Sequence, residues 1–239
     1  SGVGRLAADI VVGNGNKAWQ QFAEFPQELS VRQGSVCEKA SCLFEQHSDY
    51  WQAVDQGGVA EIFSHQADVV VLAAWRDDAQ AFNEAYRYVL QQHGRVRVGE
   101  QWFVGQMLMI EQNDYALNLF NGDVGIVLDN GGTLAAWFAE ADGYRSVPLA
   151  RLPECRTAFA LTVHKSQGSE YNQVWLLPPS ASEDTDDGVM TRPLIYTAFT
   201  RAKQRFVFWG SESVFQMACE TLQPRRTFLK ELIKRNWAK

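Results

Sequence analysis

Two short polar segments in the last third of the chain contain side chains suited to phosphate. The first, TVHKSQGSE, runs from Thr162 to Glu170, and the second, YTAFTRAK, runs from Tyr196 to Lys203. Their hydroxyl, imidazole, ammonium and guanidinium groups can donate hydrogen bonds to phosphate oxygens and sugar hydroxyls. The two segments therefore indicate contact with nucleotides or with a nucleic-acid backbone.

The first segment lies between two short apolar runs, at 158–161 and 174–177. Apolar runs of this length, bounded by polar residues, are typical of buried strands. A polar turn after such a strand occupies the edge where open α/β sheets bind ligands. In this turn Lys165 and Ser166 offer donors to phosphate, and Gly168 permits close approach of the backbone.

The second segment has the pattern of a short helix followed by a strand at 205–209. Thr197, Thr200 and Arg201 are spaced at i, i+3 and i+4, so they share one face of that helix. An arginine at the end of this helix is placed to reach a phosphate bound at the edge of a neighbouring domain. Its planar, permanently charged guanidinium suits that task better than a lysine ammonium.

Two signatures of nucleotide hydrolysis are missing from the sequence. The phosphate-binding loop G-x-x-x-x-G-K-[ST] requires a Gly-Lys pair, and the chain contains none. No apolar run ends in the Asp-Glu pair that could hold magnesium. We therefore expect the chain alone to have no ATPase activity and no bound nucleotide.

Composition and charge fit a folded protein with a narrow contact to nucleic acid. With 239 residues, 46% of them hydrophobic, the chain can bury a sizeable core. The net charge of −6 argues against a broad basic surface for DNA, although a narrow groove can still hold a single strand. Two like-charged clusters are expected to be solvated surface: Arg225, Arg226, Lys230, Lys234, Arg235 and Lys239, and Glu183, Asp184, Asp186 and Asp187.

The cysteines and histidines do not form the pattern of a metal site. Cys37, Cys42, Cys155 and Cys219 have neither zinc-ligand spacing nor the density of a disulfide scaffold, so we expect reduced, mostly buried thiols. The histidines show no ligand spacing with carboxylates or cysteines. The sequence also has no apolar run near the ~18 residues of a membrane span and no export signal at its start, so no membrane contact is expected.

The secondary-structure pattern of the sequence changes along the chain. Residues 1–65 are helical in pattern, and an apolar strand at 68–73 is followed by Arg76 and a helix from about Asp78 to Gln92. Asp77 and Asp78 are natural N-caps for this helix. Asn83 needs no functional explanation on an exposed helix face.

Between residues 99 and 153 the pattern changes to short strands, at 102–110, 125–128, 133–138 and 144–147. Gly-centred turns separate them, which favours a small barrel inserted into an α/β domain.

The two polar segments resemble the last two motifs of superfamily 1 helicases, and nearly the whole chain resembles the C-terminal part of RecD-like helicases. The resemblance is most specific at 158–210. It implies an α/β fold: a RecA-like second motor domain (66–98 and 154–239) with an inserted SH3-like β-barrel (99–153). Residues 1–65 would be a helical extension leaving the first motor domain, which the chain is expected to lack.

The resemblance also implies roles for the polar residues. The arginine matching Arg201 is the arginine finger that contacts the γ-phosphate of ATP across the interdomain cleft, which makes Arg201 the expected catalytic residue. Glu170 matches a carboxylate that faces the nucleotide, and Gly168 is placed with it. Thr162 and His164 lie where the family contacts the DNA backbone.

Arg76 matches a position near the DNA groove, although this chain has Asp-Asp-Ala-Gln where many relatives have a Gly-Pro loop. The alternative is a surface arginine. In the barrel, Asn118, Phe120 and Asn121 match a part of the family that lies along the single strand. A hairpin corner without a ligand is the alternative, because Asn-Gly is above all a turn signal.

The function implied is a 5′→3′ DNA helicase subunit of an exodeoxyribonuclease V-type complex, acting in double-strand break repair and recombination in the bacterial cytoplasm. The full-length enzyme would use ATP and Mg²⁺. Its partners would be single-stranded DNA, RecB-like and RecC-like subunits and the missing first motor domain. The alternatives are a stand-alone or relaxase-linked helicase, and a non-catalytic docking module, because the eight tryptophans suit interface anchors.

Overall fold

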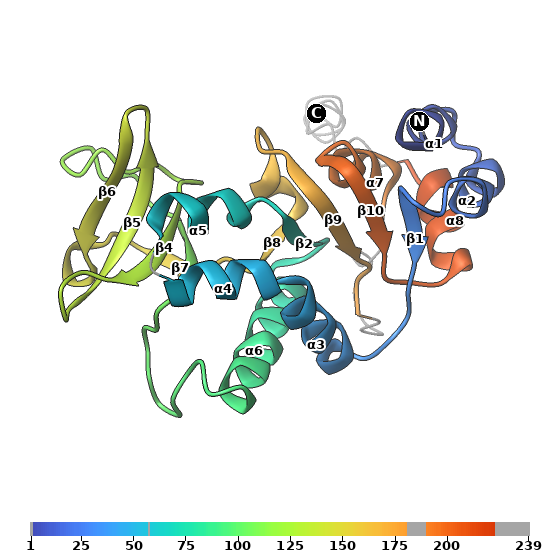
Figure 1. Cartoon of the computed structure of the whole chain (residues 1–239). Coiled ribbons are helices and arrows are strands. Elements are labelled where there is room, and N and C mark those ends of the chain that lie inside the picture. Colours follow the sequence, from blue (N-terminus) through green and yellow to red (C-terminus); the bar gives the residue numbers. More distant parts are fainter. Residues whose placement is uncertain (1, 57, 181–189, 223–239) are drawn as a thin grey trace, which may run out of the picture.

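The computed structural model describes residues 2–56, 58–180 and 190–222. The two like-charged clusters, at 183–187 and 225–239, lie outside these residues. Within them the chain is a mixed α/β protein with two sheets, one parallel and one antiparallel (Figure 1). Its mixed α/β class was predicted from the sequence and is confirmed.

The parallel sheet has the strand order β1-β10-β9-β2-β8. Its strands are β1 (Leu29–Val31), β10 (Ala202–Phe208), β9 (Tyr171–Leu177), β2 (Val69–Ala73) and β8 (Ala160–Thr162). Every residue of β2 is buried, as expected for a central parallel strand that is covered on both faces. The order places β2 and β8 side by side, with the turn after β8 at the carboxyl edge of the sheet.

Helices gather in two groups around this sheet. Figure 1 shows α1 (Gly2–Val12), α2 (Gly15–Glu24) and α8 (Glu212–Glu220) near β1. The other group contains α3 (Val36–Gln46), α4 (Ser48–Gln56), α5 (Val59–Gln66) and α6 (Arg76–Gln92), and α4 and α5 lie between the two sheets. Helix α7 (Arg192–Phe199) packs against α1 and leads into β10.

The N-terminal residues contribute a strand that the helical pattern did not predict. β1 pairs in parallel with β10, with Leu29 opposite Phe206. In α2, Phe22 lies edge-on to Phe215 of α8, with 5.2 Å between ring centroids. A three-residue strand has too little alternation to be recognised from sequence. The first helices and β1 therefore share the core of the parallel sheet, while the boundary at residue 65 stays a prediction.

Helix α6 begins earlier than predicted. Its N-cap is Trp75, which makes no capping side-chain hydrogen bond, and Asp77 and Asp78 lie inside the first turn. The prediction of an aspartate N-cap was wrong. Acidic side chains are favoured both as N-caps and in the first turn, where they face the positive end of the helix dipole, so composition alone does not locate the start.

The antiparallel sheet is inserted between α6 and β8 and has the order β6-β5-β4-β3-β7. Its strands are β3 (Gln106–Ile110), β4 (Val124–Asp129), β5 (Leu134–Glu140), β6 (Gly143–Pro148) and β7 (Cys155–Thr157). Met107 and Met109 face the core shared with the parallel sheet, whereas Leu108 and Ile110 face a second hydrophobic cluster. The four predicted strands are present. Their closure into an SH3-like barrel stays a prediction.

The thiols are less buried than expected. Cys219 is buried, Cys42 and Cys155 are half-buried, and Cys37 is exposed. Burial raises the pKa of Cys219 to about 12. In the part of the chain that the structure describes, we find no group of three potential metal-binding side chains and no helix with the length and apolarity to cross a membrane.

Candidate nucleic-acid and nucleotide site

The polar turn after β8 is present where the sequence predicted it. A short 3₁₀ helix, η2 (Val163–Ser166), connects β8 to the loop before β9. Thr162 ends β8, and His164 is exposed at the start of the turn. Gly168 has φ +89°, which L side chains rarely adopt, and no atom lies within 4 Å of the place where a Cβ would be. The turn therefore leaves space beside its backbone for a ligand.

Ser166 does not fit its expected contact with phosphate. Its side chain is fully buried, and its hydroxyl donates to the Val163 carbonyl at 2.7 Å. This bond closes the 3₁₀ turn. Ser166 therefore holds the turn in shape, and it is the neighbouring residues that face outward.

Arg201 joins the two polar segments. It follows the end of α7, and its Nε donates to the Thr197 carbonyl at 3.3 Å. Its Nη1 donates to the Ser169 carbonyl at 3.2 Å, and its Nη2 lies 3.2 Å from the Thr200 hydroxyl. The backbone amide of Tyr171 donates to the Arg201 carbonyl at 2.8 Å. Residues about thirty positions apart thus form one site.

Two residues near Arg201 differ in exposure: Glu170 is exposed and Tyr171 is buried. Glu170 lies 3.7 Å from the Lys203 ammonium in an exposed ion pair, so its carboxylate is on the surface beside the turn. Burial raises the pKa of the Tyr171 hydroxyl, which keeps this side chain neutral. The charges around the turn are therefore carried by Arg201, Lys203, Glu170 and Lys165.

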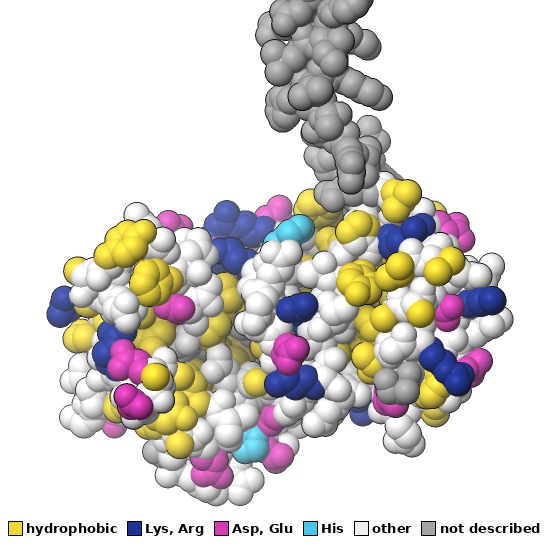
Figure 2. Space-filling view, turned by 90° about the horizontal axis from the view of Figure 1, so that it is seen from above, with side chains coloured by type: hydrophobic (Ala, Val, Ile, Leu, Met, Phe, Trp, Pro, Cys, Tyr) yellow, Lys and Arg dark blue, Asp and Glu magenta, His cyan; other side chains and the backbone are white. Residues whose placement is uncertain are grey.

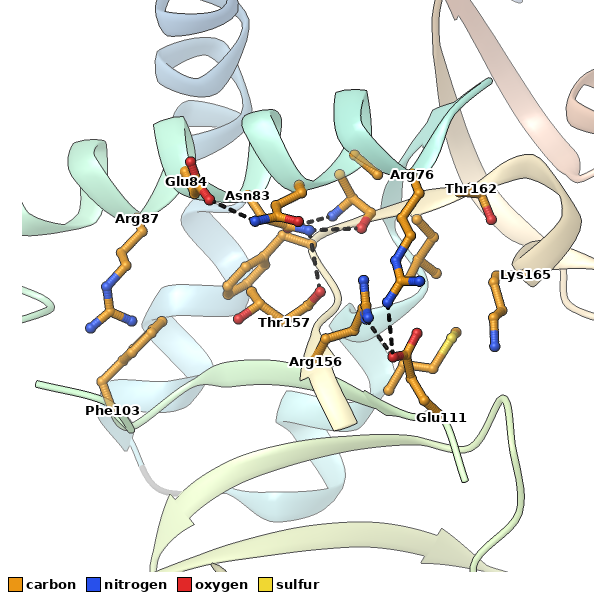
Figure 3. A pocket seen from close by; sticks show the side chains of 16 residues that line it. Arg76, Asn83, Glu84, Arg87, Phe103, Glu111, Arg156, Thr157, Thr162 and Lys165 are labelled. Carbon is orange, nitrogen blue, oxygen red and sulfur yellow. Dashed lines mark hydrogen bonds and ion pairs between the residues drawn. The ribbon is translucent and has the colours of Figure 1, made fainter. Parts of the chain in front are cut away.

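A cleft of about 540 Å³ lies beside the turn, between α6, β8 and the antiparallel sheet (Figure 3). Arg76, Thr162 and Lys165 lie at one end of it, and Arg87 and Phe103 lie at the other. The Arg87 guanidinium sits 5.4 Å from the centre of the Phe103 ring. On the face drawn in Figure 2, Lys and Arg side chains lie across the middle of the molecule, with Asp and Glu side chains among them.

Arg76 stands at the rim of this cleft with a side chain that is 64% exposed. Its Nη2 lies 3.7 Å from Glu111, whose carboxylate also lies 2.6 Å from Arg156 Nε. One carboxylate thus faces two guanidinium groups, which leaves excess positive charge at the rim. Arg76, Thr162 and Lys165 line the same cleft, and the DNA-binding role of Arg76 stays a prediction.

The two predicted asparagines are placed differently. Lys165 donates to Asn121 Oδ1 at 2.6 Å, so the turn after β8 touches the loop between β3 and β4. Asn118, with φ +49°, lines another cavity of about 550 Å³ with Phe63 and Phe138. The structure brings Asn121 to the site and leaves Asn118 at a different one.

Asn83 was dismissed as an exposed helix residue, and that interpretation was wrong. Its Nδ2 donates to the carbonyls of Ala160 at 2.9 Å and Thr157 at 3.2 Å, and its Oδ1 accepts from the Ala160 amide at 2.9 Å. This half-buried amide holds α6 to the chain between β7 and β8. The missed signal is helical spacing, because Asn83 shares a face with Ala79 and Tyr86, and both are buried.

Comparisons with known proteins show which proteins this chain resembles. A family model, the UvrD-like helicase C-terminal domain, matches residues 157–208. RecBCD enzyme subunit RecD of Mycolicibacterium smegmatis is 37% identical over 237 residues, which are 97% of this chain and 41% of that protein. The same subunit of Haemophilus influenzae is 27% identical over 98% of this chain and 39% of its own length. The chain therefore spans about two fifths of these relatives.

A further curated relative and one solved structure extend the comparison. The ATP-dependent RecD2 DNA helicase of Deinococcus radiodurans is 36% identical over 59% of this chain and 19% of that protein. A Bacteroides Pif1 helicase with ADP-AlF3 and single-stranded DNA aligns at a TM-score of 0.40 and 15% identity, over 72% of this chain and 45% of that one. The curated relatives and the family model identify the chain as the C-terminal part of a RecD-like helicase.

Proposed function

We propose that this chain is the second motor domain of an ATP-dependent 5′→3′ DNA helicase. It would grip single-stranded DNA and supply Arg201 to ATP held by the first motor domain. The observation that carries the proposal is the position of Arg201, whose guanidinium bonds the Ser169 carbonyl of the polar turn. This hydrogen bond joins the residue that we propose to contact phosphate to the turn that we propose to contact the DNA backbone.

The nucleotide end of the site is proposed to work through charge. Arg201 uses part of its five N–H donors on three oxygens of its own chain, which orients the guanidinium and leaves donors for a phosphate. Charge that develops on the γ-phosphate in the transition state would be stabilised by these donors. Gly168 and Glu170 would border the nucleotide, since both lie in the loop between η2 and β9.

The DNA end of the site is proposed to hold the strand by its backbone. Thr162, Lys165 and Arg76 line one cleft, and His164 is exposed on the adjoining turn. Contacts of this kind reach phosphates and sugars, so they carry no base information. Asn121 supports the Lys165 ammonium, and Asn118 would contact the strand only at a separate surface.

The same proposal covers the whole protein. It would use ATP and Mg²⁺, assemble with RecB-like and RecC-like subunits, and act in break repair and recombination in the bacterial cytoplasm. Residues 66–98 and 154–239 would form the RecA-like domain, 99–153 the SH3-like insertion and 1–65 the segment leaving the first motor domain. The relatives named as RecD subunits of RecBCD support this reading. The RecD2 relative keeps the stand-alone helicase as the alternative.

The decisive experiment measures ATP hydrolysis on single-stranded DNA by the full-length protein, in its complex if it forms one. Arg201→Ala should lower the turnover rate on the order of 10³-fold or more, as for other arginine fingers. Arg201→Lys should not restore it, because an ammonium is a point charge and not a planar fork.

The matched control is Arg5→Ala, which removes an arginine from an exposed ion pair with Glu24, between α1 and α2. It should leave turnover within a small factor of the unmodified protein. Circular dichroism checks the fold of each variant. Near-normal hydrolysis by folded Arg201→Ala would overturn the proposed role, and the guanidinium would then only connect α7 to the turn.

A further inference from the structure

In the part of the chain that the structure describes, Thr200 is the only residue whose side chain accepts a hydrogen bond from Arg201. Arg201 Nη2 donates to the Thr200 hydroxyl oxygen at 3.2 Å. The other two oxygens that accept from this guanidinium, those of Thr197 and Ser169, are backbone carbonyls. Of the three contacts, only the one to Thr200 therefore depends on which side chain the sequence supplies.

The Thr200 hydroxyl acts as an acceptor toward Arg201. A threonine hydroxyl has one proton and two lone pairs, and this one donates its proton to the Thr197 carbonyl at 3.0 Å. A guanidinium has donors but no acceptor, so the direction of the contact with Arg201 agrees. The Thr197 carbonyl also accepts from Arg201 Nε at 3.3 Å. The carbonyl, the hydroxyl and the guanidinium thus form a closed ring of hydrogen bonds at the end of α7.

This ring of hydrogen bonds holds a long side chain in one orientation. The guanidinium has five N–H donors, and its three bonds use one donor on each nitrogen. One N–H therefore remains on Nη1 and one on Nη2. Donors on these two nitrogens can bind two oxygens of one phosphate. An arginine that is oriented in advance loses less rotamer freedom when it makes such a contact.

We propose that Thr200 is a positioning residue, whose hydroxyl oxygen orients the Arg201 guanidinium toward the phosphate of ATP. This inference rests on the proposed function of Arg201 and adds to it a residue that acts through the guanidinium. Donors stabilise the charge of a transition state best when they are already in place. Loss of the hydroxyl should therefore lower the turnover number kcat and leave the KM for ATP nearly unchanged.

The experiment measures steady-state ATP hydrolysis by the full-length protein on single-stranded DNA. Thr200→Val replaces the hydroxyl by a methyl group and should lower kcat on the order of tenfold, the effect of one lost hydrogen bond to a charged group. Thr200→Ser keeps the hydroxyl, so its kcat should stay within a small factor of the unmodified protein. Circular dichroism checks each fold, and Thr200→Ala removes the same hydroxyl if Thr200→Val does not fold.

Thr197→Val makes the same change one turn earlier on α7 and serves as the control. The Thr197 hydroxyl donates to the Pro193 carbonyl at 2.8 Å, and only the backbone carbonyl of Thr197 meets Arg201. Its kcat should stay within a small factor of the unmodified protein. Equal losses in Thr197→Val and Thr200→Val, or in Thr200→Ser and Thr200→Val, would overturn the positioning role.

A double-mutant cycle separates positioning from a structural role. When Thr200→Val is added to Arg201→Ala, kcat should fall no further, because the hydroxyl acts only through the guanidinium. A further loss of similar size in that background would show that Thr200 supports the fold instead. Normal kcat in Thr200→Val, together with very low turnover in Arg201→Ala, would overturn the inference and leave the proposed function standing. Near-normal turnover in Arg201→Ala would instead refute the proposed function itself.

Discussion

The parallel and antiparallel sheets bury their strands in different ways. In β2 of the parallel sheet all five residues enter a single core. In β3 of the antiparallel sheet the residues alternate: Met107 and Met109 enter that same core, and Leu108 and Ile110 enter a separate cluster. The insertion is therefore not an independent module, because one of its faces completes the core of the domain that carries the polar turn.

Polar contacts reinforce the junction between the two sheets. The Tyr50 hydroxyl of α4 donates to the Gly105 carbonyl at 2.8 Å, just before β3. Glu111 and Asn121, from the antiparallel side, meet Arg76 and Lys165 on the parallel side. Such a junction keeps the loop at 111–123 beside the cleft. We therefore expect the stability of the fold to depend on the junction and contact with ligands to depend on the turn. Variants can test these two roles separately.

The largest stability effect is expected at Gly105, where the two sheets join. Its φ is +82°, and an added Cβ would lie 2.5 Å from a carbon of the buried Trp51 ring. Gly105→Ala should lower the free energy of unfolding by roughly 2 to 5 kcal/mol, from a left-handed backbone and an overpacked core together. Urea denaturation measures this loss.

Gly99→Ala separates these two causes. Gly99 has φ +81°, but no atom lies within 4 Å of its Cβ position, so only the backbone cost of about 1 to 2 kcal/mol applies. Equal losses for the two variants would mean that the contact with Trp51 contributes nothing to the junction.

A second prediction concerns the pH dependence of stability, to which the buried His47 should contribute. Its Nδ1 lies 2.9 Å from the Tyr86 hydroxyl, and burial lowers its pKa from 6.5 to about 4. Below pH 6.5, His47 binds a proton in the unfolded chain but stays neutral in the folded chain. The free energy of unfolding should therefore fall between about pH 6.5 and 4, by up to roughly 3 kcal/mol.

Unfolding in urea at pH 7.5 and pH 5 tests this sign. His47→Gln should unfold more easily at pH 7.5 but lose less stability on acidification than the unmodified protein. His164→Gln removes an exposed histidine and keeps His47, so it should keep this contribution to the pH dependence. An unchanged pH dependence in His47→Gln would show that other groups cause it.

The smallest change in free energy is expected when one cation of the cleft is removed. Lys165→Ala should weaken single-strand binding by about 1 kcal/mol and reduce the slope of log Kd against log salt concentration by about one, as for a lost phosphate contact. Lys203→Ala removes the same charge from an ion pair outside the cleft. If both variants change the slope equally, the effect is one of net charge and not of contact. Stability should change little in either.

Local patterns were enough to predict several features. The apolar runs and Gly-centred turns predicted β2, β4, β5, β6 and the turn before β9 within a few residues, because strand alternation and turn chemistry are encoded by neighbours in sequence. The same reasoning failed for β1, which is too short to show an alternating pattern. It also failed for the start of α6, because aspartate is favoured both as an N-cap and in the first turn of a helix.

Residue types and spacing alone determined that Arg201, Thr162, His164 and Lys165 lie in segments rich in hydrogen-bond donors, because donor groups are intrinsic to the side chains; that these segments contact phosphate stays a prediction. Only the tertiary structure decided which polar side chains bond within the protein. The buried Ser166 hydroxyl donates to the backbone of its own turn. The half-buried Asn83 amide donates to the chain between β7 and β8. The shared core brought Asn121 to Lys165 across 44 positions. Such contacts depend on long-range packing, which no local window of sequence contains.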